Sequence, residues 1–207
     1  MRKFGLHDNL TDKEKRLIRT LRRQVLSWAK SQDVFYYWRK KPTAYSILMA
    51  ELLLQRTRAQ QAEKQFIIYM KKYPTFSKLQ KAKKSGLSKI FRPLGLEKRV
   101  NTVTTLVKVI NKNYNGDIPK KYEDLMKLPG VGDYIANAVM IFALNRPGWL
   151  VDVNIIKVFS DLFGLNISRE EGKKSKFIKE CSKYFTSLGN PRKSNWNLLD
   201  YAMKNGG

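Results

Sequence analysis

The sequence has almost none of the residues that build disulfide frameworks and metal sites. Among its 207 residues there are one cysteine, Cys181, and one histidine, His7. A single cysteine excludes an internal disulfide framework and indicates a reducing compartment. An iron–sulfur cluster needs four cysteines, so these residues cannot supply one. A zinc site and serine or cysteine nucleophile chemistry, both of which rely on histidine, are not expected either.

Long apolar runs and acidic residues are also scarce. No apolar stretch approaches the roughly 20 residues of a membrane span, and the N-terminus lacks the apolar core of a signal peptide. We therefore expect no membrane partner and a cytoplasmic, nucleoid-associated location. Only 17 Asp and Glu oppose 41 Lys and Arg, which gives a formal net charge of +24 at pH 7. This positive field favours nucleic acid, although charge alone leaves open a protein that binds ribosomes or anionic membrane.

Hydrophobic spacing predicts helices along the whole chain and no strand. Thr11, with Glu14 three residues later, forms a capping box that predicts the start of a helix over Thr11–Lys30. The remaining predicted helical stretches are Ala44–Gln55, which is apolar on most sides, Ala59–Lys72, a pair over Phe76–Ile90 broken at Gly86, Val100–Tyr114, Asp152–Phe163, Ser168–Leu188 and Asn195–Met203. The expected fold class is therefore all-α.

The chain is organised around residues 128–132, Leu-Pro-Gly-Val-Gly, which separate two helical segments, Lys121–Lys127 and Tyr134–Leu144. Gly130 and Gly132 let the backbone adopt positive φ and approach another surface closely. The second segment begins with unpaired backbone N–H groups, which suit a phosphate at a helix N-terminus. The pattern predicts two short helices joined by a hairpin turn that grips a phosphate backbone.

The hairpin and three further motifs resemble the helix-hairpin-helix DNA glycosylase superfamily, in particular its endonuclease III-like branch. The resemblance runs from about Tyr37 to Tyr201, and the further motifs are Glu51–Thr57, Gly95–Leu96 and Val151–Asn154. It implies a six-helix barrel lobe containing the hairpin, residues 43–147. A second helical lobe, residues 1–42 and 148–207, would carry the catalytic aspartate, with a cleft between the lobes for DNA and the extracted base.

The resemblance implies that Asp152 and Tyr134 are catalytic residues. Asp152 matches the family's aspartate, whose carboxylate stabilises the sugar cation and can activate water; its position at a helix start should favour the ionised form. As an alternative, Asp152 is an ordinary N-cap. Strand-nicking members have a lysine where this chain has Tyr134, so the resemblance implies a monofunctional enzyme that forms no Schiff base. Tyr134 could instead pack the hairpin onto the barrel.

Glu51 is the third residue that the resemblance makes catalytic. It interrupts an apolar helix, where an ionised carboxylate is costly without a partner. Burial should raise its pKa and suit it to protonating the departing base, as the corresponding residue does in adenine glycosylases. The alternative is a structural ion pair with an arginine or lysine.

The remaining matched positions are expected to bind DNA. Gln55 and Leu96 would fill the gap left by the flipped base and wedge the opposite strand, although Leu96 could be a core residue and Gln55 a surface amide. Asn154 would hold the water or the sugar beside Asp152. The hairpin positions expected to bind the phosphate backbone are Leu128, Gly130, Val131 and Gly132.

The resemblance implies removal of thymine or uracil opposite guanine from double-stranded DNA by a monomer. An adenine glycosylase and a non-catalytic hairpin DNA-binding protein are the alternatives. No cofactor is expected in this chain. Relatives in the endonuclease III-like branch usually continue into a cluster-binding loop where the sequence stops at Asn205-Gly206-Gly207, so either this member lacks the cluster or the sequence is cut short before that loop. A monovalent cation at the hairpin is compatible with the resemblance, and no other metal is expected.

Overall fold

The computed structural model describes residues 9–205, and His7 therefore lies outside the described residues. Every regular element between residues 9 and 205 is helical, which confirms the prediction of an all-α fold. None of the helices in this range is both long and apolar enough to cross a membrane.

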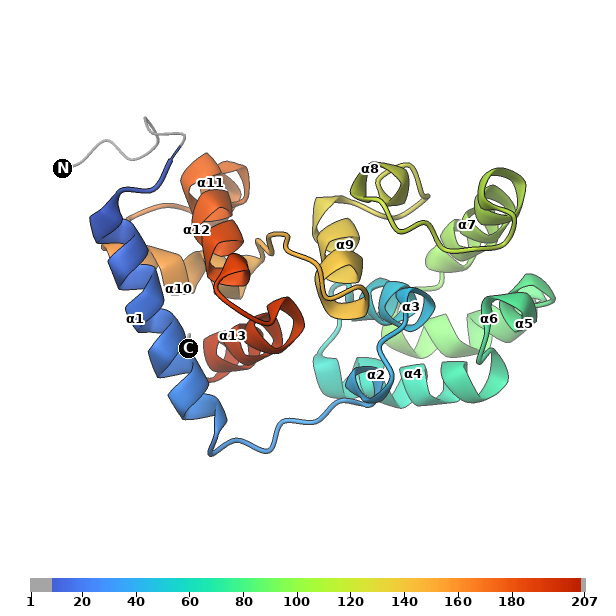
Figure 1. Ribbon diagram of the computed structural model, residues 1–207. Coiled ribbons are helices and arrows are strands. Elements are labelled where there is room, and N and C mark those ends of the chain that lie inside the picture. Colours follow the sequence, from blue (N-terminus) through green and yellow to red (C-terminus); the bar gives the residue numbers. More distant parts are fainter. Residues whose placement is uncertain (1–8, 206–207) are drawn as a thin grey trace. The chain divides into compact units, whose positions relative to one another are not determined.

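Contacts divide the chain into two units, which Figure 1 shows with their helices labelled. One unit is Phe35–Leu144, and the other combines the described residues up to Val34 with those from Asn145 onward. The resemblance predicts the boundaries after residues 42 and 147. The first boundary falls earlier because Trp38 is buried and meets Phe66 of the Phe35–Leu144 unit edge-on, at 5.8 Å between ring centroids. We call Phe35–Leu144 the central unit and the other the terminal unit.

The terminal unit is a helical bundle around one apolar core. Its helices are α1 (Asp12–Ala29), α10 (Val153–Phe163), α11 (Arg169–Lys174), α12 (Lys176–Ser187) and α13 (Pro191–Asn205). The predicted capping box at Thr11 and Glu14 is present at the start of α1. One apolar stripe of α1, including Ile18 and Val25, is fully buried in this core, and α1 packs against α12 and α13.

The central unit surrounds a helix that is buried on nearly every side. That helix is α3 (Ala44–Leu54), where an apolar sequence on all faces predicted burial. Around it lie α2 (Tyr37–Lys40), α4 (Ala59–Lys72), α5 (Phe76–Gln80), α6 (Lys84–Phe91), the 3₁₀ turn η1 (Arg92–Leu94), α7 (Arg99–Tyr114), α8 (Tyr122–Leu125), α9 (Asp133–Ala138) and the π-helical segment η2 (Val139–Ala143). α3 packs against α4, α9 and η2.

The prediction that Gly86 breaks the helical pair over Phe76–Ile90 is wrong. The break between α5 and α6 lies at residues 81–83, and Gly86 is inside α6. A Cβ atom at Gly86 would lie 2.5 Å from the hydroxyl oxygen of Tyr73. Glycine is therefore needed here for close packing rather than for ending a helix.

Candidate active site and hairpin

The hairpin turn joins α8 to α9, as the glycine pattern predicts. Gly130 has a φ of +79°, and a Cβ there would lie 2.5 Å from Cγ2 of Thr102, so both the backbone and the packing require glycine. The prediction of positive φ at Gly132 is wrong, because this residue has a φ of −105°. Gly132 is the N-cap of α9, a position that normally adopts extended backbone. A Cβ at Gly132 would meet no atom within 4 Å, which leaves the start of α9 open.

Two of the predicted DNA-binding residues of the hairpin have buried side chains. Leu128 is 2% exposed and Val131 is 7% exposed. The N–H of Val131 donates to the carbonyl oxygen of Leu128 at 3.1 Å, which closes the turn. These two side chains therefore fix the hairpin to the core, and only their backbone groups can meet a partner.

A hydrogen-bonded brace across the hairpin was not predicted from the sequence. The hydroxyl of Tyr122 on α8 donates to Oδ1 of Asp133 on α9 at 2.5 Å. The side-chain amide of Asn137 donates to the backbone oxygen of Asp133 at 2.9 Å. Burial, followed by the hydrogen bond with Asp133, raises the pKa of Tyr122 to about 12, so its phenol stays a donor at neutral pH. The brace holds the two hairpin helices together.

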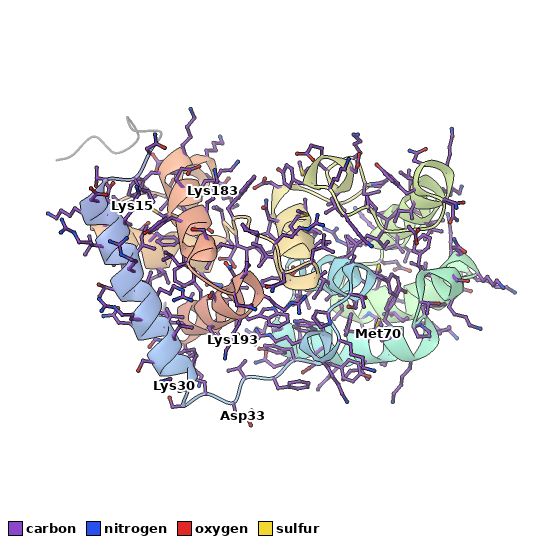
Figure 2. The ribbon with its side chains drawn as sticks, in the orientation of Figure 1. Lys15, Lys30, Asp33, Met70, Lys183 and Lys193 are labelled. Atoms are coloured by element: carbon purple, nitrogen blue, oxygen red, sulfur yellow. The ribbon has the colours of Figure 1, made fainter. Side chains whose placement is uncertain are left out.

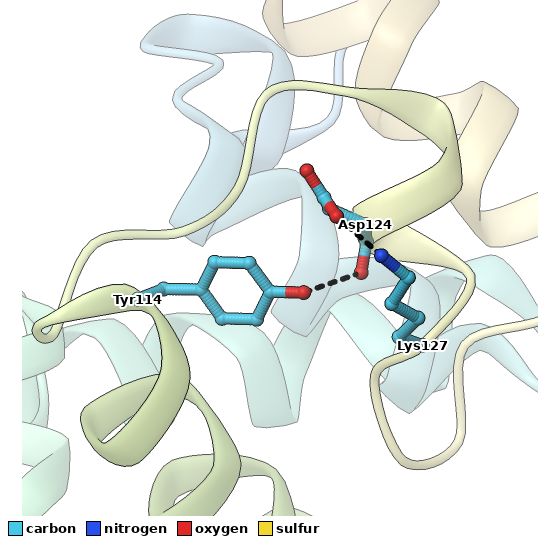
Figure 3. Close-up of polar contacts among 3 residues, drawn as sticks. All are labelled: Tyr114, Asp124 and Lys127. Atoms are coloured by element: carbon cyan, nitrogen blue, oxygen red, sulfur yellow. Dashed lines mark hydrogen bonds and ion pairs between the residues drawn. The ribbon is translucent and has the colours of Figure 1, made fainter.

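The first hairpin helix is also tied to the end of α7 (Figure 3). The hydroxyl of Tyr114 donates to the backbone oxygen of Asp124 at 3.4 Å, and Lys127 Nζ lies 2.9 Å from Asp124 Oδ1. The ion pair is exposed and contributes little to stability. Since Tyr114 is the last residue of α7, this contact fixes where α8 begins relative to α7.

Glu51 and Tyr134 lie on neighbouring helices of the central unit. Glu51 is on α3 and is only 8% exposed, whereas Tyr134 is half-buried on α9. The two helices pack directly against each other. The structure thus brings together the elements that carry two of the predicted catalytic residues, while Asp152 belongs to the terminal unit.

Gln55 and Leu96 lie at turns of the central unit, and both are partly exposed. Gln55 is the C-cap of α3 and precedes Arg56, which has a φ of +60°. Leu96 follows Gly95, whose φ is +69°, and its N–H donates to the carbonyl oxygen of Phe91 at 3.0 Å. The side chain of Leu96 is only partly buried, so part of it can meet a partner.

Asp152 is the N-cap of α10, as predicted. Its Oδ1 accepts a hydrogen bond from the backbone N–H of Ile155 at 2.7 Å. Further hydrogen bonds from the backbone and side chain of Asn154 also favour the carboxylate. Burial outweighs these bonds and raises the pKa of Asp152 above its ordinary value. The hydrogen bonds at the helix start favour the ionised form, as expected. Burial opposes them more strongly, so the pKa of Asp152 is raised overall.

The segment leading into Asp152 is held by a residue that the sequence does not predict. Ser182 of α12 is 1% exposed, and its Oγ both accepts from the backbone N–H of Leu150 and donates to the Leu150 carbonyl oxygen, each at 2.8 Å. Beside it, Lys179 Nζ lies 4.0 Å from the ring centroid of Trp149. No local pattern could reveal Ser182, because its partner lies 32 residues away.

Within residues 9–205, no group of three or more His, Cys, Asp or Glu side chains could hold a metal ion. Burial raises the pKa of the Cys181 thiol well above its ordinary value, and the thiol is therefore a core group rather than a nucleophile. Asp152, Glu51 and Tyr134 stay the candidate catalytic residues predicted from the sequence.

Comparisons with known proteins agree with these motifs. A model described as "Helix-hairpin-helix motif" matches residues 113–142. Thymine-DNA glycosylase of Aeropyrum pernix is 33% identical over 76% of this chain and 71% of its own length. Thymine/uracil-DNA glycosylase of Pyrobaculum aerophilum is 31% identical over 81% of this chain and 74% of its own length. Adenine DNA glycosylases match over less than half of their own length.

A solved structure described as a thermostable thymine-DNA glycosylase superimposes with a TM-score of 0.82 at 26% identity, covering 92% of this chain and 88% of that one. Identity above 30% over more than two thirds of a relative's length, together with this shared fold, establishes the family. The chain belongs to the helix-hairpin-helix family of DNA glycosylases, the enzymes of base excision repair that hydrolyse the N-glycosyl bond.

Proposed function

We propose that this glycosylase removes thymine or uracil opposite guanine from double-stranded DNA and leaves the abasic strand intact. The relatives named as thymine- and thymine/uracil-DNA glycosylases support this choice of base. The net charge of +24 supports binding to the DNA backbone. We propose that the protein acts as a monomer.

The observation that carries the proposal is the fixed, partly buried carboxylate of Asp152. A base can be removed only after its nucleotide has left the duplex stack. As the glycosidic bond breaks, positive charge develops on the sugar, and a preorganised carboxylate stabilises it without having to reorganise. The hydrogen bond from Ile155 N–H holds Asp152 in one orientation. In this proposal Asp152 stabilises the sugar cation and activates the attacking water, while Asn154, which is hydrogen-bonded to it, orients that water or the sugar.

The other candidate residues divide into chemistry and DNA positioning. Glu51 is assigned the protonation of the departing base, because its carboxyl group lies on α3, which packs against α9, the helix of Tyr134. A phenol at Tyr134 cannot form a Schiff base with the sugar, which supports an enzyme without strand-nicking activity. Leu96 and Gln55 occupy turns and are partly exposed, which suits side chains that fill the space of the flipped nucleotide.

The hairpin binds the phosphate backbone in this proposal. The open start of α9 at Gly132 lets backbone N–H groups approach a phosphate, and Gly130 shapes the turn that presents them. Leu128 and Val131 contribute backbone groups and hold the turn on the core.

A panel of labelled duplexes tests the proposal. Duplexes containing G·T, G·U and A opposite oxidised guanine are incubated with the protein, and strands are analysed with and without alkali. We expect alkali-dependent cleavage of the G·T and G·U duplexes, no cleavage without alkali, and no covalent complex after borohydride treatment. Cleavage confined to the adenine duplex would instead establish adenine glycosylase activity, whereas no cleavage of any duplex would favour a non-catalytic DNA-binding protein.

A further inference from the structure

The central unit contains a long stretch without any acidic residue. Between Glu63 and Glu97 there is no Asp or Glu, but there are nine Lys and Arg residues. All nine are exposed. The stretch comprises the second half of α4, all of α5 and α6, and the turn η1. It therefore concentrates positive charge on one continuous part of the chain.

These basic side chains have no acidic partner, in contrast to lysines elsewhere. In the terminal unit, Lys173 lies 2.7 Å from Glu170, and Lys183 on α12 (Figure 2) lies 3.6 Å from Glu180. Among the described residues, none of the nine makes an ion pair with a carboxylate. Glu97, the acid that ends the stretch, accepts a hydrogen bond from the Ser88 hydroxyl at 2.8 Å. The charge of α5 and α6 is thus available to an external polyanion.

The position of this charge points to the type of polyanion. α6 ends in η1, and η1 leads directly into Gly95 and Leu96, the residue proposed to wedge the DNA strand. An eight-residue helix is about 12 Å long, so α6 extends roughly three to four phosphates of one strand away from that turn. The apolar side chains Leu79, Leu87 and Ile90 face the core, which leaves lysines on the outer faces of α5 and α6.

We propose that the outer faces of α5 and α6 bind the phosphate backbone of the duplex flank on the Leu96 side of the target base. This basic flank surface is represented by Lys78, Lys81, Lys83 and Lys84. It lies apart in sequence from the hairpin and enlarges the DNA footprint on one side only. The inference rests on the proposed function, because it requires DNA to be engaged at Leu96.

The test compares DNA affinity for a variant in which Lys78, Lys81, Lys83 and Lys84 are changed to Gln. With a duplex of roughly 30 base pairs carrying a central mismatch, we expect the dissociation constant at about 0.1 M salt to rise by at least about tenfold and at most about 10³-fold, and the slope of log K against log salt to fall by about 3. The single-turnover rate of base release at saturating enzyme should be unchanged, since these side chains do not contact the base.

Two controls make the test specific. A variant with Lys173, Lys174, Lys176 and Lys183 changed to Gln loses the same charge from α11 and α12, and its affinity should change by less than about threefold. Duplexes shortened to about five base pairs on one side of the mismatch form the second control. Shortening the flank on the Leu96 side should abolish the difference in DNA affinity between wild type and the α5–α6 variant. Shortening the other flank should preserve this difference.

The inference is wrong if the α5–α6 variant binds DNA as tightly as wild type, or if the α11–α12 variant loses as much affinity. It is also wrong if the α5–α6 variant loses the same affinity for both shortened duplexes. Because binding is measured separately from base release, the two proposals can fail independently. A one-sided loss of affinity in a protein that releases no base would preserve the basic flank surface and refute the enzymatic substrate assignment.

Discussion

Asp152 illustrates how chemistry and stability oppose each other at a single residue. Burial raises its pKa, so the folded state favours the protonated carboxyl. The protonated carboxyl of Asp152 stabilises the folded state relative to the unfolded state. This stabilisation is complete below the ordinary pKa of aspartate and is lost as the pH rises through the raised pKa of Asp152. Burial thus disfavours the charged carboxylate of Asp152, which is the form that the proposed reaction needs.

Replacing Asp152 with Asn should separate these two effects. The amide oxygen can still accept the Ile155 N–H bond and the NH2 group no longer accepts a bond from Asn154, but no charge remains to be buried. We expect the free energy of unfolding at pH 7 to increase by about 0.5–2 kcal/mol in urea titrations. Base release should fall at least about 10²-fold in single-turnover assays. A variant that is destabilised at pH 7 but fully active would contradict both parts.

The same pKa shift determines how the rate of base release should depend on pH in the acidic range. The carboxylate form is the active one, so the rate should rise with pH through the pKa of Asp152. Because burial raises this pKa, the midpoint should lie above 3.8, the ordinary value for aspartate. Single-turnover rates between roughly pH 4 and 8, with enzyme in excess, would measure it. A profile that stays flat down to the ordinary aspartate value would exclude Asp152 as the titrating group.

At the scale of the elements, the two hairpin glycines have different tasks. Gly130→Ala requires a side chain at a φ of +79° and close to Thr102, and it should lower the free energy of unfolding by about 1–3 kcal/mol. Gly132→Ala meets no steric obstacle within the chain. It should keep wild-type stability and yet weaken DNA binding, because the methyl group faces the proposed phosphate. Thermal unfolding and DNA-binding titrations of both variants would distinguish a folding role from a contact role.

The loop before α10 offers a second matched pair of variants. Ser182→Ala leaves the buried N–H and C=O of Leu150 without partners and should lower the free energy of unfolding by about 1–3 kcal/mol. Thr186→Val, one turn later on α12, removes a hydroxyl bonded to the Ser182 backbone oxygen and to Asn195. Both variants should be destabilised. Only Ser182→Ala should slow single-turnover base release, by about tenfold, because it loosens the segment that positions Asp152.

If both variants release base at the wild-type rate, the loop is held by other contacts and Ser182 is purely structural. Equal slowing in both would indicate a general effect of destabilisation. A denaturation curve for each variant, recorded at the assay temperature, ensures that the rates refer to folded protein.

The helices were predictable from sequence wherever the signal is local. The capping box of Thr11 and Glu14, the bounds of α4 and the N-cap at Asp152 all depend on residues within a few positions of each other. The prediction at Gly86 was wrong because packing against Tyr73, not helix ending, requires glycine there. At Gly132 a glycine pair suggested two positive φ angles, whereas this residue is the N-cap of α9 and has extended backbone. Ser182 and the Tyr122–Asp133 brace involve long-range partners and leave no local pattern.

For the molecule as a whole, the excess of positive charge predicts strongly salt-dependent DNA binding. Six or more phosphate contacts would lower the affinity for undamaged duplex by about 10³-fold between roughly 50 and 200 mM salt. Fluorescence anisotropy over this range would measure the slope. A shallow slope, corresponding to one or two contacts, would mean that most of the 41 basic residues serve solubility rather than binding.

The terminal unit is assembled from two chain segments that are separated by the entire central unit. During synthesis, α1 leaves the ribosome before α12 and α13 exist to cover Ile18 and Val25. At ribosomal speeds of 5–20 residues per second, the helix waits on the order of 10 s. The segment carries many basic residues, among them the exposed Lys13, Arg16 and Arg23, and we expect their like charges to oppose self-association of its apolar stripe until the partner helices emerge.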